Sequence, residues 1–177
     1  MTGRFFFVVG PSGAGKDTLL SGAVAADPRL HWARRVITRP EAAGGEPFEG
    51  VTEAEFAVRL ARGDFALEWQ AHGLCYGVPH RELAPMAGGR DVVLNGSRAA
   101  LGQARAAFPS LVLLHVTAPL ALLADRLVAR GREDRADVEA RLARASVALP
   151  EDCPVIEIVN DASAETGVAR LLQALRG

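Results

Sequence analysis

The feature of the sequence that most limits the fold is the stretch GPSGAGKDT, residues 10–18. The apolar run Phe5–Val9 precedes it and reads as a buried strand, and the helical pattern Lys16–Ala26 follows it. The glycines and the lysine fit the pattern G-x-x-x-x-G-K, which joins a strand to a helix through a tight loop. We therefore expect these segments to form the first strand, loop and helix of a parallel α/β sheet.

The same stretch predicts a phosphate-binding loop. Its glycines allow several backbone N–H groups to face one phosphate, and the helix that follows adds the positive end of its dipole. Lys16 is the only lysine beside nineteen arginines, and an ammonium is a more compact cation than a guanidinium. We predict that Lys16 is catalytic and reaches the β- and γ-phosphates of ATP. The predicted nucleotide-binding residues are Gly10, Pro11, Ser12, Gly13, Ala14, Gly15, Lys16, Asp17 and Thr18.

Asp17 departs from the usual pattern, which has serine or threonine directly after the lysine. A carboxylate is a hard oxygen ligand that Mg²⁺ accepts, and Thr18 offers a hydroxyl one residue later. We predict that Asp17, with or without Thr18, binds Mg²⁺ directly or through water. The alternative is that Asp17 only complements the dipole of the following helix. A carboxylate beside phosphates without a metal would be repelled, which favours the first interpretation.

The rest of the chain alternates apolar runs with helical patterns. Such alternation is typical of a parallel sheet with helices on both faces, and 177 residues suffice for one domain, residues 1–177. The five predicted strands are Phe5–Val9, Val92–Leu94, Leu111–Val116, Val155–Val159 and the weaker Arg34–Thr38. The predicted helices are Lys16–Ala26, Glu53–Arg62, Arg98–Ala107, Leu120–Ala129, Val138–Leu149 and Ala164–Leu175.

Arginines cluster around the sequence ARGRED, residues 129–134, and on the helix predicted after it. Phosphoryl transfer gains mostly from positioning and from cations that face the developing charge. We predict that residues 130–137 form a lid that closes over the phosphates. The alternative is a solvated helix pair whose arginines bind nearby carboxylates. The arginines predicted to be catalytic are Arg130, Arg132 and Arg141.

Residues 39–80 interrupt the strand–helix alternation and are predicted to be an insertion that binds the phosphate acceptor. Arg39 would leave a strand at the carboxyl edge of the parallel sheet, where ligands bind in such folds, and its fork fits a phosphate. Asn95 is neutral where many P-loop enzymes carry a metal-organising aspartate, so Asp17 would supply the missing charge. The predicted acceptor-binding residues are Thr38, Arg39, Glu46, His72, Tyr76, Asn95, Ser97 and Arg98; for His72 a structural role is the alternative.

The amino-acid composition argues against some classes of binding partner. The formal net charge is −1, which gives no general attraction to nucleic acid or to a membrane surface. The apolar run Phe5–Val9 is too short for a signal-peptide core or a membrane span. Cys75 and Cys153 lack metal-binding spacing, so we expect free thiols in a reducing cytoplasm. The partner that we expect is a small-molecule substrate. Composition gives no indication of a protein partner.

Several motifs resemble the guanylate kinase superfamily, P-loop NTPases with the nucleoside monophosphate kinase-like fold, across almost the whole chain: GPSGAGK, TRP followed by GE, G-x-x-YG and RL-x-x-RGR. Within that superfamily, GPSGAGKDTLL, ITRP, HGLCYGV, NGSRA and RGRE are similar to the ribose 1,5-bisphosphate phosphokinases of bacterial phosphonate catabolism. The Lys-Asp pair and NGSR are specific to that branch. The resemblance implies transfer of phosphate from ATP to ribose 1,5-bisphosphate, giving 5-phosphoribosyl 1-diphosphate (PRPP).

The sequence also departs from both patterns. Guanylate kinases carry a second arginine after TRxP, a tyrosine after GE and an acidic pair at the strand that here holds Asn95, and this chain has none of them. In the nearer branch a histidine often follows GE, where this chain has Phe48. Two alternatives stay open at this point: a guanylate kinase that converts GMP to GDP, and a non-catalytic guanylate-kinase-like module that binds a protein. The intact loop and the arginine cluster favour an enzyme.

Overall fold

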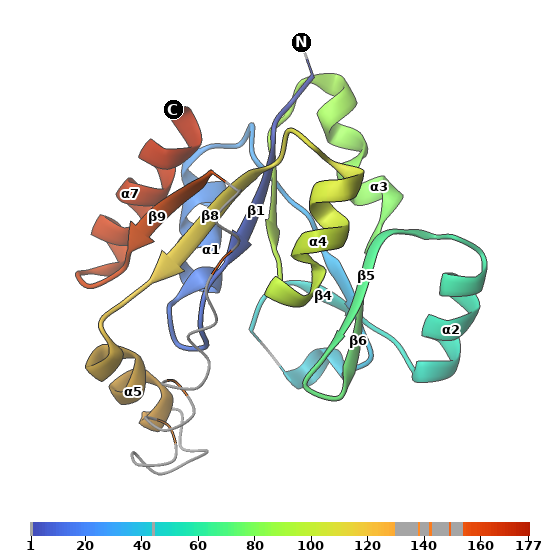
Figure 1. Cartoon of the computed structure of the whole chain (residues 1–177), viewed down its shortest axis with the longest axis horizontal. Coiled ribbons are helices and arrows are strands. Elements are labelled where there is room, and N and C mark those ends of the chain that lie inside the picture. The colour runs from blue at the N-terminus through green and yellow to red at the C-terminus, as the bar shows by residue number, and fades with distance from the viewer. Residues whose placement is uncertain (1, 44, 130–137, 139–141, 143–148, 150–153) are drawn as a thin grey trace.

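A computed structural model describes residues 2–43, 45–129, 138, 142, 149 and 154–177 of the chain. Its strands form two sheets, one of five strands and one of four (Figure 1). The chain begins in the five-stranded sheet, passes through the four-stranded sheet and then returns to the first sheet. The phosphate-binding loop therefore belongs to one sheet, and most of the predicted acceptor insertion belongs to the other.

The five-stranded sheet has the order β2-β7-β1-β8-β9, and every pair in it is parallel. This confirms the predicted five-stranded parallel sheet. Because β1 lies in the middle, the loop that follows it opens at the centre of the carboxyl edge of the sheet, where ligands bind in such folds. The strands are β1 (Phe5–Val9), β2 (His31–Trp32), β7 (Val92–Asn95), β8 (Val112–Thr117) and β9 (Val155–Val159).

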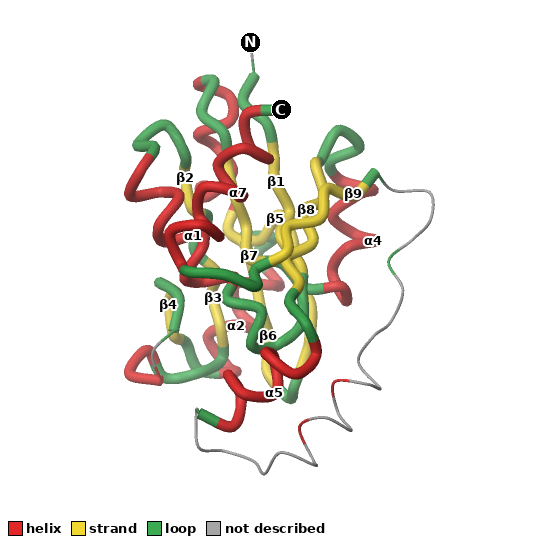
Figure 2. Tube along the Cα trace, turned by 90° about the vertical axis from the view of Figure 1, so that its left-hand side faces the viewer, coloured by secondary structure: helices red, strands yellow, loops and turns green. Residues whose placement is uncertain are grey.

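Helices cover both faces of the parallel sheet, as predicted (Figure 2). Alternate residues of β1 face opposite layers. Phe6 packs in one apolar cluster with α1 (Lys16–Ala26) and α7 (Ala164–Arg176). Phe7 packs in a second cluster with α4 (Arg98–Ala107). Both phenylalanines are almost completely buried, so β1 and its loop are fixed from both sides.

The four-stranded sheet has the order β4-β3-β6-β5. Strand β3 pairs parallel with β4 and antiparallel with β6. A two-residue turn joins β5 to β6, and His72 and Gly73 have φ of 52° and 73°, as expected for a hairpin turn with two left-handed residues. The strands are β3 (Arg35–Ile37), β4 (Phe48–Gly50), β5 (Phe65–Ala71) and β6 (Leu74–Pro79).

The structure corrects one predicted strand. Arg34–Thr38 was expected in the parallel sheet, but β3, which lies within it, belongs to the four-stranded sheet. The fifth parallel strand is β2, and its two residues are too few to show a pattern. A short apolar run indicates burial but does not say which strand will pair with it. The four-stranded sheet, which includes most of the predicted insertion, therefore begins before residue 39, at β3.

The two sheets share an apolar core, because Leu67 of β5 and Val78 of β6 pack in the same cluster as Phe7 and Leu101. Helix α2 (Glu53–Ala61) starts with a capping box at Thr52. The remaining short elements are η1 (Glu41–Ala43), α3 (His80–Leu83), η2 (Ala84–Gly88) and α5 (Leu120–Val128). No helix in the described part of the chain has the length and apolar character that crossing a membrane requires.

Candidate active site

The phosphate-binding loop turns between β1 and α1. Gly13 and Gly15 have φ of 85° and 86°, left-handed values that glycine adopts without strain. Gly15 is also the N-cap of α1, and no described side chain caps this helix end, which suits an anion that accepts from the first N–H groups. Lys16 Nζ donates to Gly10 O at 2.8 Å and to Pro11 O at 3.2 Å. These bonds hold the ammonium across the loop.

Two side chains from distant segments hold the back of the loop. Asn160 is buried and its Nδ2 donates to Ala14 O at 2.8 Å. Arg126 donates to Gly13 O at 3.3 Å and to Asn160 O at 3.1 Å. A Cβ on Gly15 would lie 2.5 Å from Asn160 Nδ2, so the close approach requires glycine. Sequence analysis missed Asn160; its position directly after a parallel strand was the available signal.

A pocket of about 330 Å³ opens beside the loop, between the end of α5 and the start of α7. Thr18 is exposed and lines this pocket. The pocket borders the same loop residues that Arg126 and Asn160 hold, which gives it a fixed wall. Its lining residues are Gly13, Gly15, Thr18, Leu19, Arg126, Ala129, Asn160, Ala162 and Ala164.

Asp17 is hydrogen-bonded to the parallel sheet. Asn95 is the last residue of β7, pairs with Val8 of β1, and is 5% exposed. Its Nδ2 donates to Asp17 Oδ1 at 2.6 Å. Its Oδ1 is buried and has no hydrogen-bond partner among the described residues. The two residues that depart from the usual P-loop pattern therefore touch each other, with an amide where a second carboxylate would be repelled.

These groups bear on the predicted metal ligands. The Asp17 carboxylate and the Asn95 amide oxygen are hard oxygens of the kind that Mg²⁺ prefers. Thr18 instead faces the pocket beside the loop, so only Asp17 of the two predicted ligands lies at the Asn95 contact. The described residues contain no group of three or more His, Cys, Asp or Glu side chains arranged to hold a metal ion.

A buried ion pair joins β3 to the segment just before β4, and this segment approaches Asp17. Arg35 Nε donates to Glu46 Oε2 at 3.1 Å, and Nη2 donates to Oε1. The two side chains are 10% and 5% exposed. A Cβ on Gly45 would lie 3.9 Å from Asp17 Oδ2, so the segment that carries Glu46 reaches the phosphate-binding loop. Burial lowers the pKa of Arg35 to about 10, which still leaves the guanidinium charged near neutral pH.

Aromatic rings form one wall of this region. Trp69 and Tyr76 lie opposite each other on β5 and β6 and stack with ring centroids 5.2 Å apart and 2° between planes. The Arg35 guanidinium lies 5.1 Å from the Tyr76 centroid and 5.8 Å from that of Trp69. Trp69 is 7% exposed and packs in the core, so its role is structural. His72 is exposed in the hairpin turn, and its predicted contact with the acceptor stays a prediction.

The predicted residues at the end of β3 lie on the insertion. Thr38 Oγ1 accepts from Cys75 N at 2.9 Å, which ties the end of β3 to β6. The Arg39 guanidinium lies 4.4 Å from the centroid of the Phe48 ring. Arg39 therefore follows a strand of the four-stranded sheet, and its expected place at the carboxyl edge of the parallel sheet was wrong. Its predicted role in phosphate binding is a separate matter and stays a prediction.

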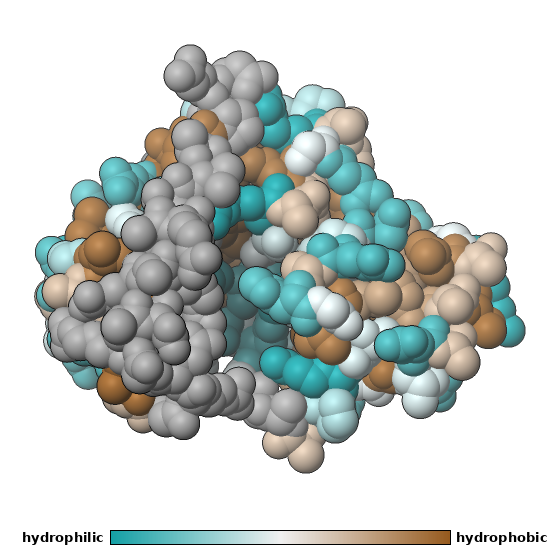
Figure 3. Space-filling model, turned by 60° about the horizontal axis from the view of Figure 1, so that its bottom comes forward, coloured by the Kyte–Doolittle hydropathy of each residue, from teal (hydrophilic) through white to brown (hydrophobic). Residues whose placement is uncertain are grey.

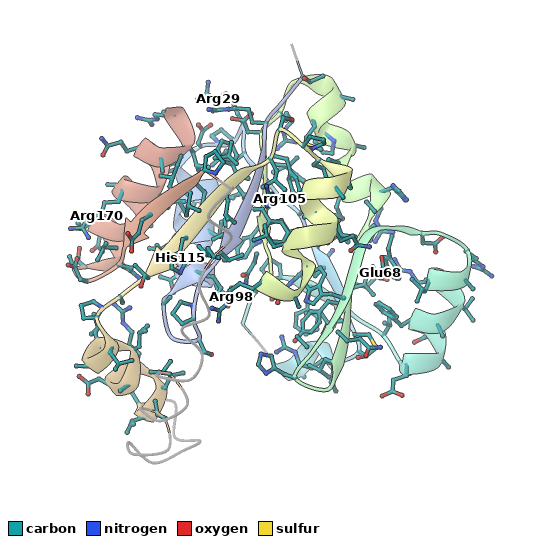
Figure 4. The ribbon with its side chains drawn as sticks, in the orientation of Figure 1. Arg29, Glu68, Arg98, Arg105, His115 and Arg170 are labelled. Atoms are coloured by element: carbon teal, nitrogen blue, oxygen red, sulfur yellow. The ribbon has the colours of Figure 1, made fainter. Side chains whose placement is uncertain are left out.

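Ser97 and Arg98 begin α4. Ser97 Oγ accepts from Ala99 N at 3.3 Å and caps the helix. Arg98, on α4, and His115, on β8, are both labelled in the central part of the molecule (Figure 4). Burial lowers the pKa of His115; the Glu157 carboxylate opposes this, and the positive charges of Arg98 and Lys16 lower the pKa further. Sequence analysis missed His115, because a single histidine in a strand forms no motif.

Hydrophilic side chains border a hollow on the lower face of the molecule (Figure 3). The predicted lid arginines Arg130, Arg132 and Arg141 lie outside the described residues. Their catalytic role, and the lid at residues 130–137, stay predictions.

No family model matches the chain. It is 48% identical over 173 residues to the ribose 1,5-bisphosphate phosphokinase PhnN of Ruegeria sp. (strain TM1040), a match that covers 98% of this chain and 91% of that protein. It is 44% identical over 178 residues to the protein of the same name from Rhizobium etli, with 99% and 90% covered. The chain belongs to the ribose 1,5-bisphosphate phosphokinase family. The resemblance found from the sequence motifs is thereby confirmed.

The phosphokinase family also includes longer proteins. The chain is 51% identical over 176 residues to the bifunctional ribose 1,5-bisphosphokinase-thymidine phosphorylase of Cupriavidus necator. That match covers 99% of this chain but only 29% of the bifunctional protein. Among solved structures, a guanylate kinase from Anaplasma phagocytophilum superposes with a TM-score of 0.70 at 19% identity, covering 99% of this chain and 85% of the other. This second likeness confirms the predicted P-loop kinase fold and says nothing about substrate.

Proposed function

We propose that the chain is a kinase that transfers the γ-phosphoryl group of ATP to ribose 1,5-bisphosphate, forming 5-phosphoribosyl 1-diphosphate and ADP. The observation that carries the proposal is the likeness to the Ruegeria phosphokinase over 98% of this chain and 91% of that protein. The fold supports a phosphoryl transfer, because a P-loop kinase loop lies at the centre of the sheet edge. The proposal concerns the phosphokinase reaction alone.

The donor half of the site binds ATP through its phosphates. Backbone N–H groups of the loop donate to the phosphate oxygens, and the positive end of the α1 dipole stabilises their negative charge. In the structure Lys16 donates to the carbonyl oxygens of Gly10 and Pro11, which keep its ammonium group at the loop. When ATP binds, Lys16 would donate to the β- and γ-phosphates instead. The pocket of about 330 Å³ beside Thr18 and Arg126 takes the nucleoside.

Mg²⁺ fits the groups at the end of the loop. Asp17 would hold it directly or through water, with the buried Asn95 oxygen beside the carboxylate. When bound, Mg²⁺ neutralises charge on the β- and γ-phosphates. The contribution of the chain is to fix the Asp17 carboxylate by the 2.6 Å bond from Asn95. The neutral amide does this without adding a second negative charge near the phosphates.

The acceptor atom is an oxygen of the C1 phosphate of the sugar. This oxygen is already anionic, so the reaction requires no strong general base. It attacks the γ-phosphorus, a new P–O–P bond forms, and the bond to the β-phosphate oxygen breaks to release ADP. The chain contributes by in-line positioning and by cations. We assign acceptor binding to Arg39, Tyr76 and Arg98, and charge stabilisation on closure to the arginines of residues 130–141.

The proposed context is phosphonate catabolism in the bacterial cytoplasm, as the resemblance implies. The guanylate kinase alternative has only the shared fold in its favour, since the solved guanylate kinase is 19% identical. The non-catalytic alternative is disfavoured by the intact loop and its single lysine.

The test is an acceptor panel followed by phosphorus NMR. The purified chain is incubated with ATP and Mg²⁺ and with ribose 1,5-bisphosphate, ribose 5-phosphate or GMP. We expect the pair of doublets of a diphosphate on C1 with the bisphosphate alone. Efficient formation of GDP, with no product from the bisphosphate, would overturn the proposal and restore the guanylate kinase alternative.

A further inference from the structure

We propose that Arg35 binds a phosphate of the acceptor and lets the enzyme distinguish a sugar bisphosphate from a monophosphate, with Glu46 as the positioning residue that orients it. This inference rests on the proposed function. It gives a role to a buried cation that no sequence motif marks, and it changes the expected role of Glu46. Sequence analysis predicted that Glu46 binds the acceptor directly, whereas in the structure both of its carboxylate oxygens accept from Arg35.

The buried Arg35–Glu46 pair is not readily explained by stability. Burying two charges is expensive, and such a pair is often no more stabilising than apolar residues of the same volume. Arg35 and Glu46 are nevertheless 10% and 5% exposed in side chain, and they come from segments 11 residues apart. An account by stability alone therefore gives little reason for the pair, which points to a use for the oriented guanidinium.

Glu46 and two aromatic rings fix the orientation of the Arg35 guanidinium. Glu46 takes the Nε and Nη2 donors of Arg35, and the Tyr76 and Trp69 rings lie against the guanidinium, with centroids 5.1 Å and 5.8 Å away. Nη1 makes no hydrogen bond with the described residues. A guanidinium has five donors in a fixed plane, so fixing one edge aims the other. The arrangement preorganises Arg35 for an oxyanion at low conformational cost.

The segment that carries Glu46 lies beside the phosphate-binding loop. The segment of Glu46 reaches Asp17 at Gly45, where an added Cβ would lie 3.9 Å from the carboxylate. Burial is the main cause of the low pKa of Arg35; the Tyr76 and Asp17 charges raise this pKa, and the Arg39 charge lowers it. Arg35 is therefore close enough to Asp17 and Arg39 for their charges to act on it. Acceptor phosphates bound at the two guanidinium groups would offset their mutual repulsion.

Arg35 would allow the enzyme to discriminate between acceptors with two phosphates and acceptors with one. A site that pairs both phosphates of the acceptor rejects a ligand that lacks one, because a buried charged donor is then left unpaired. Two cations on separate parts of the insertion, Arg35 on β3 and Arg39 after it, suit a ligand with two separate phosphates. Removal of Arg35 should therefore reduce the preference for the bisphosphate and leave ATP binding unchanged.

The test is the double variant Arg35→Met/Glu46→Met, which removes both buried charges and fills similar volume. Dissociation constants for ribose 1,5-bisphosphate, ribose 1-phosphate and ribose 5-phosphate are measured by calorimetry without ATP, and KM for ATP is measured separately. We expect about 100-fold weaker binding of the bisphosphate, the loss of a charged hydrogen-bonding partner. At least one monophosphate should bind as in the unsubstituted chain, and KM for ATP should stay within about 2-fold.

A matched control is offered by a second arginine–glutamate pair, which joins α2 to β4 of the four-stranded sheet. Arg59 pairs with Glu49 at 2.6 Å, and its guanidinium lies 5.2 Å from the Phe65 ring centroid. It is thus a second arginine with a carboxylate and an aromatic partner, but on α2. The variant Arg59→Met/Glu49→Met should leave all three sugar phosphate affinities unchanged. Equal weakening in both double variants would show a general effect on the insertion and overturn the inference.

A second variant covers the case in which the Arg35/Glu46 double variant does not fold. Arg35→Lys keeps the charge and a bond to Glu46 but loses the planar fork, and it should weaken the bisphosphate by about 10-fold. Unchanged affinity for all three ligands in Arg35→Lys, or an unchanged preference in a folded double variant, overturns the inference alone. Failure of the unsubstituted chain to bind the bisphosphate overturns the proposed function as well, so the two failures are distinguishable.

Discussion

In our proposal, the phosphate-binding loop and the acceptor insertion both bind phosphate, but they do so in different ways. The loop uses backbone N–H groups and one lysine from nine consecutive residues, 10–18. The insertion uses guanidinium groups that strand pairing brings together, and it holds Arg35 through Glu46 and against the Trp69–Tyr76 stack. A loop of backbone donors suits the phosphate chain common to all nucleoside triphosphates, whereas placed side chains select one acceptor.

The two regions meet at Asp17. Asn95 holds its Oδ1 from the parallel sheet, and Gly45 of the insertion approaches its Oδ2. A change in the loop should therefore alter catalysis with any acceptor, and a change in the insertion should alter the choice of acceptor.

The largest effect is expected at Lys16. Lys16→Ala should lower kcat by about 1,000-fold, because the β- and γ-phosphates lose their direct cation. Lys16→Arg should also be poor, since the wide fork does not fit where the ammonium lies 2.8 Å from Gly10 O. The measurement is steady-state release of ADP. A near-normal rate for Lys16→Arg would show that the loop needs only a positive charge.

Asp17 should show the next largest effect. Asp17→Asn should lower kcat by about 100-fold and raise the Mg²⁺ concentration needed for half-maximal rate, because the carboxylate is the ligand that the chain offers. Thr18→Ala is the control, since Thr18 lines the pocket beside the loop, and its Mg²⁺ dependence should be normal. An unchanged Mg²⁺ dependence in Asp17→Asn would leave Asp17 only its role at the end of α1.

Tyr76 tests the insertion at a smaller scale. Tyr76→Phe keeps the ring that stacks on Trp69 and should raise KM for the acceptor by about 10-fold, the loss of one hydrogen bond. Tyr76→Leu should in addition lose about 1 kcal/mol of stability, as the aromatic pair is broken. KM for ATP should be unchanged in both. A matching rise in KM for ATP would contradict the division of labour between the two regions.

The smallest effect concerns His115, on a strand of the parallel sheet. Its pKa in the folded chain is lowered below the ordinary value of 6.5, chiefly by burial. The unfolded chain therefore binds more protons in the interval between the two values, and stability should fall as the pH drops from 6.5 through the lowered pKa. His115→Gln should flatten this part of the curve, measured by urea unfolding from pH 7.5 to 5. An identical curve in the variant would remove His115 as the cause.

The sequence predicted the loop well, because its function is written in consecutive residues and its flanking strand and helix have clear patterns. It also predicted that Asp17 compensates for the neutral Asn95, although the bond between them needed the structure. Arg35 and Asn160 were missed for a common reason. Each acts through a contact that depends on which strands are neighbours, and strand neighbours cannot be derived from the local pattern.

The insertion shows the same limit more clearly. The apolar pattern of Arg34–Thr38 correctly indicated a buried strand, and the sheet to which it belongs was wrong because its partners β4 and β6 lie 10 or more residues away. The capping box at Thr52, by contrast, depends only on residues three positions apart.

The most direct test of the central claim, that loop and insertion bind donor and acceptor and meet at Asp17, is a crystal structure of the chain with a non-hydrolysable ATP analogue, Mg²⁺ and ribose 1,5-bisphosphate. The account predicts the triphosphate on residues 10–18, Asp17 bound to Mg²⁺ directly or through one water, and acceptor phosphates on Arg35 and Arg39. An acceptor bound away from the four-stranded sheet, with Arg35 contacting only Glu46, would contradict it.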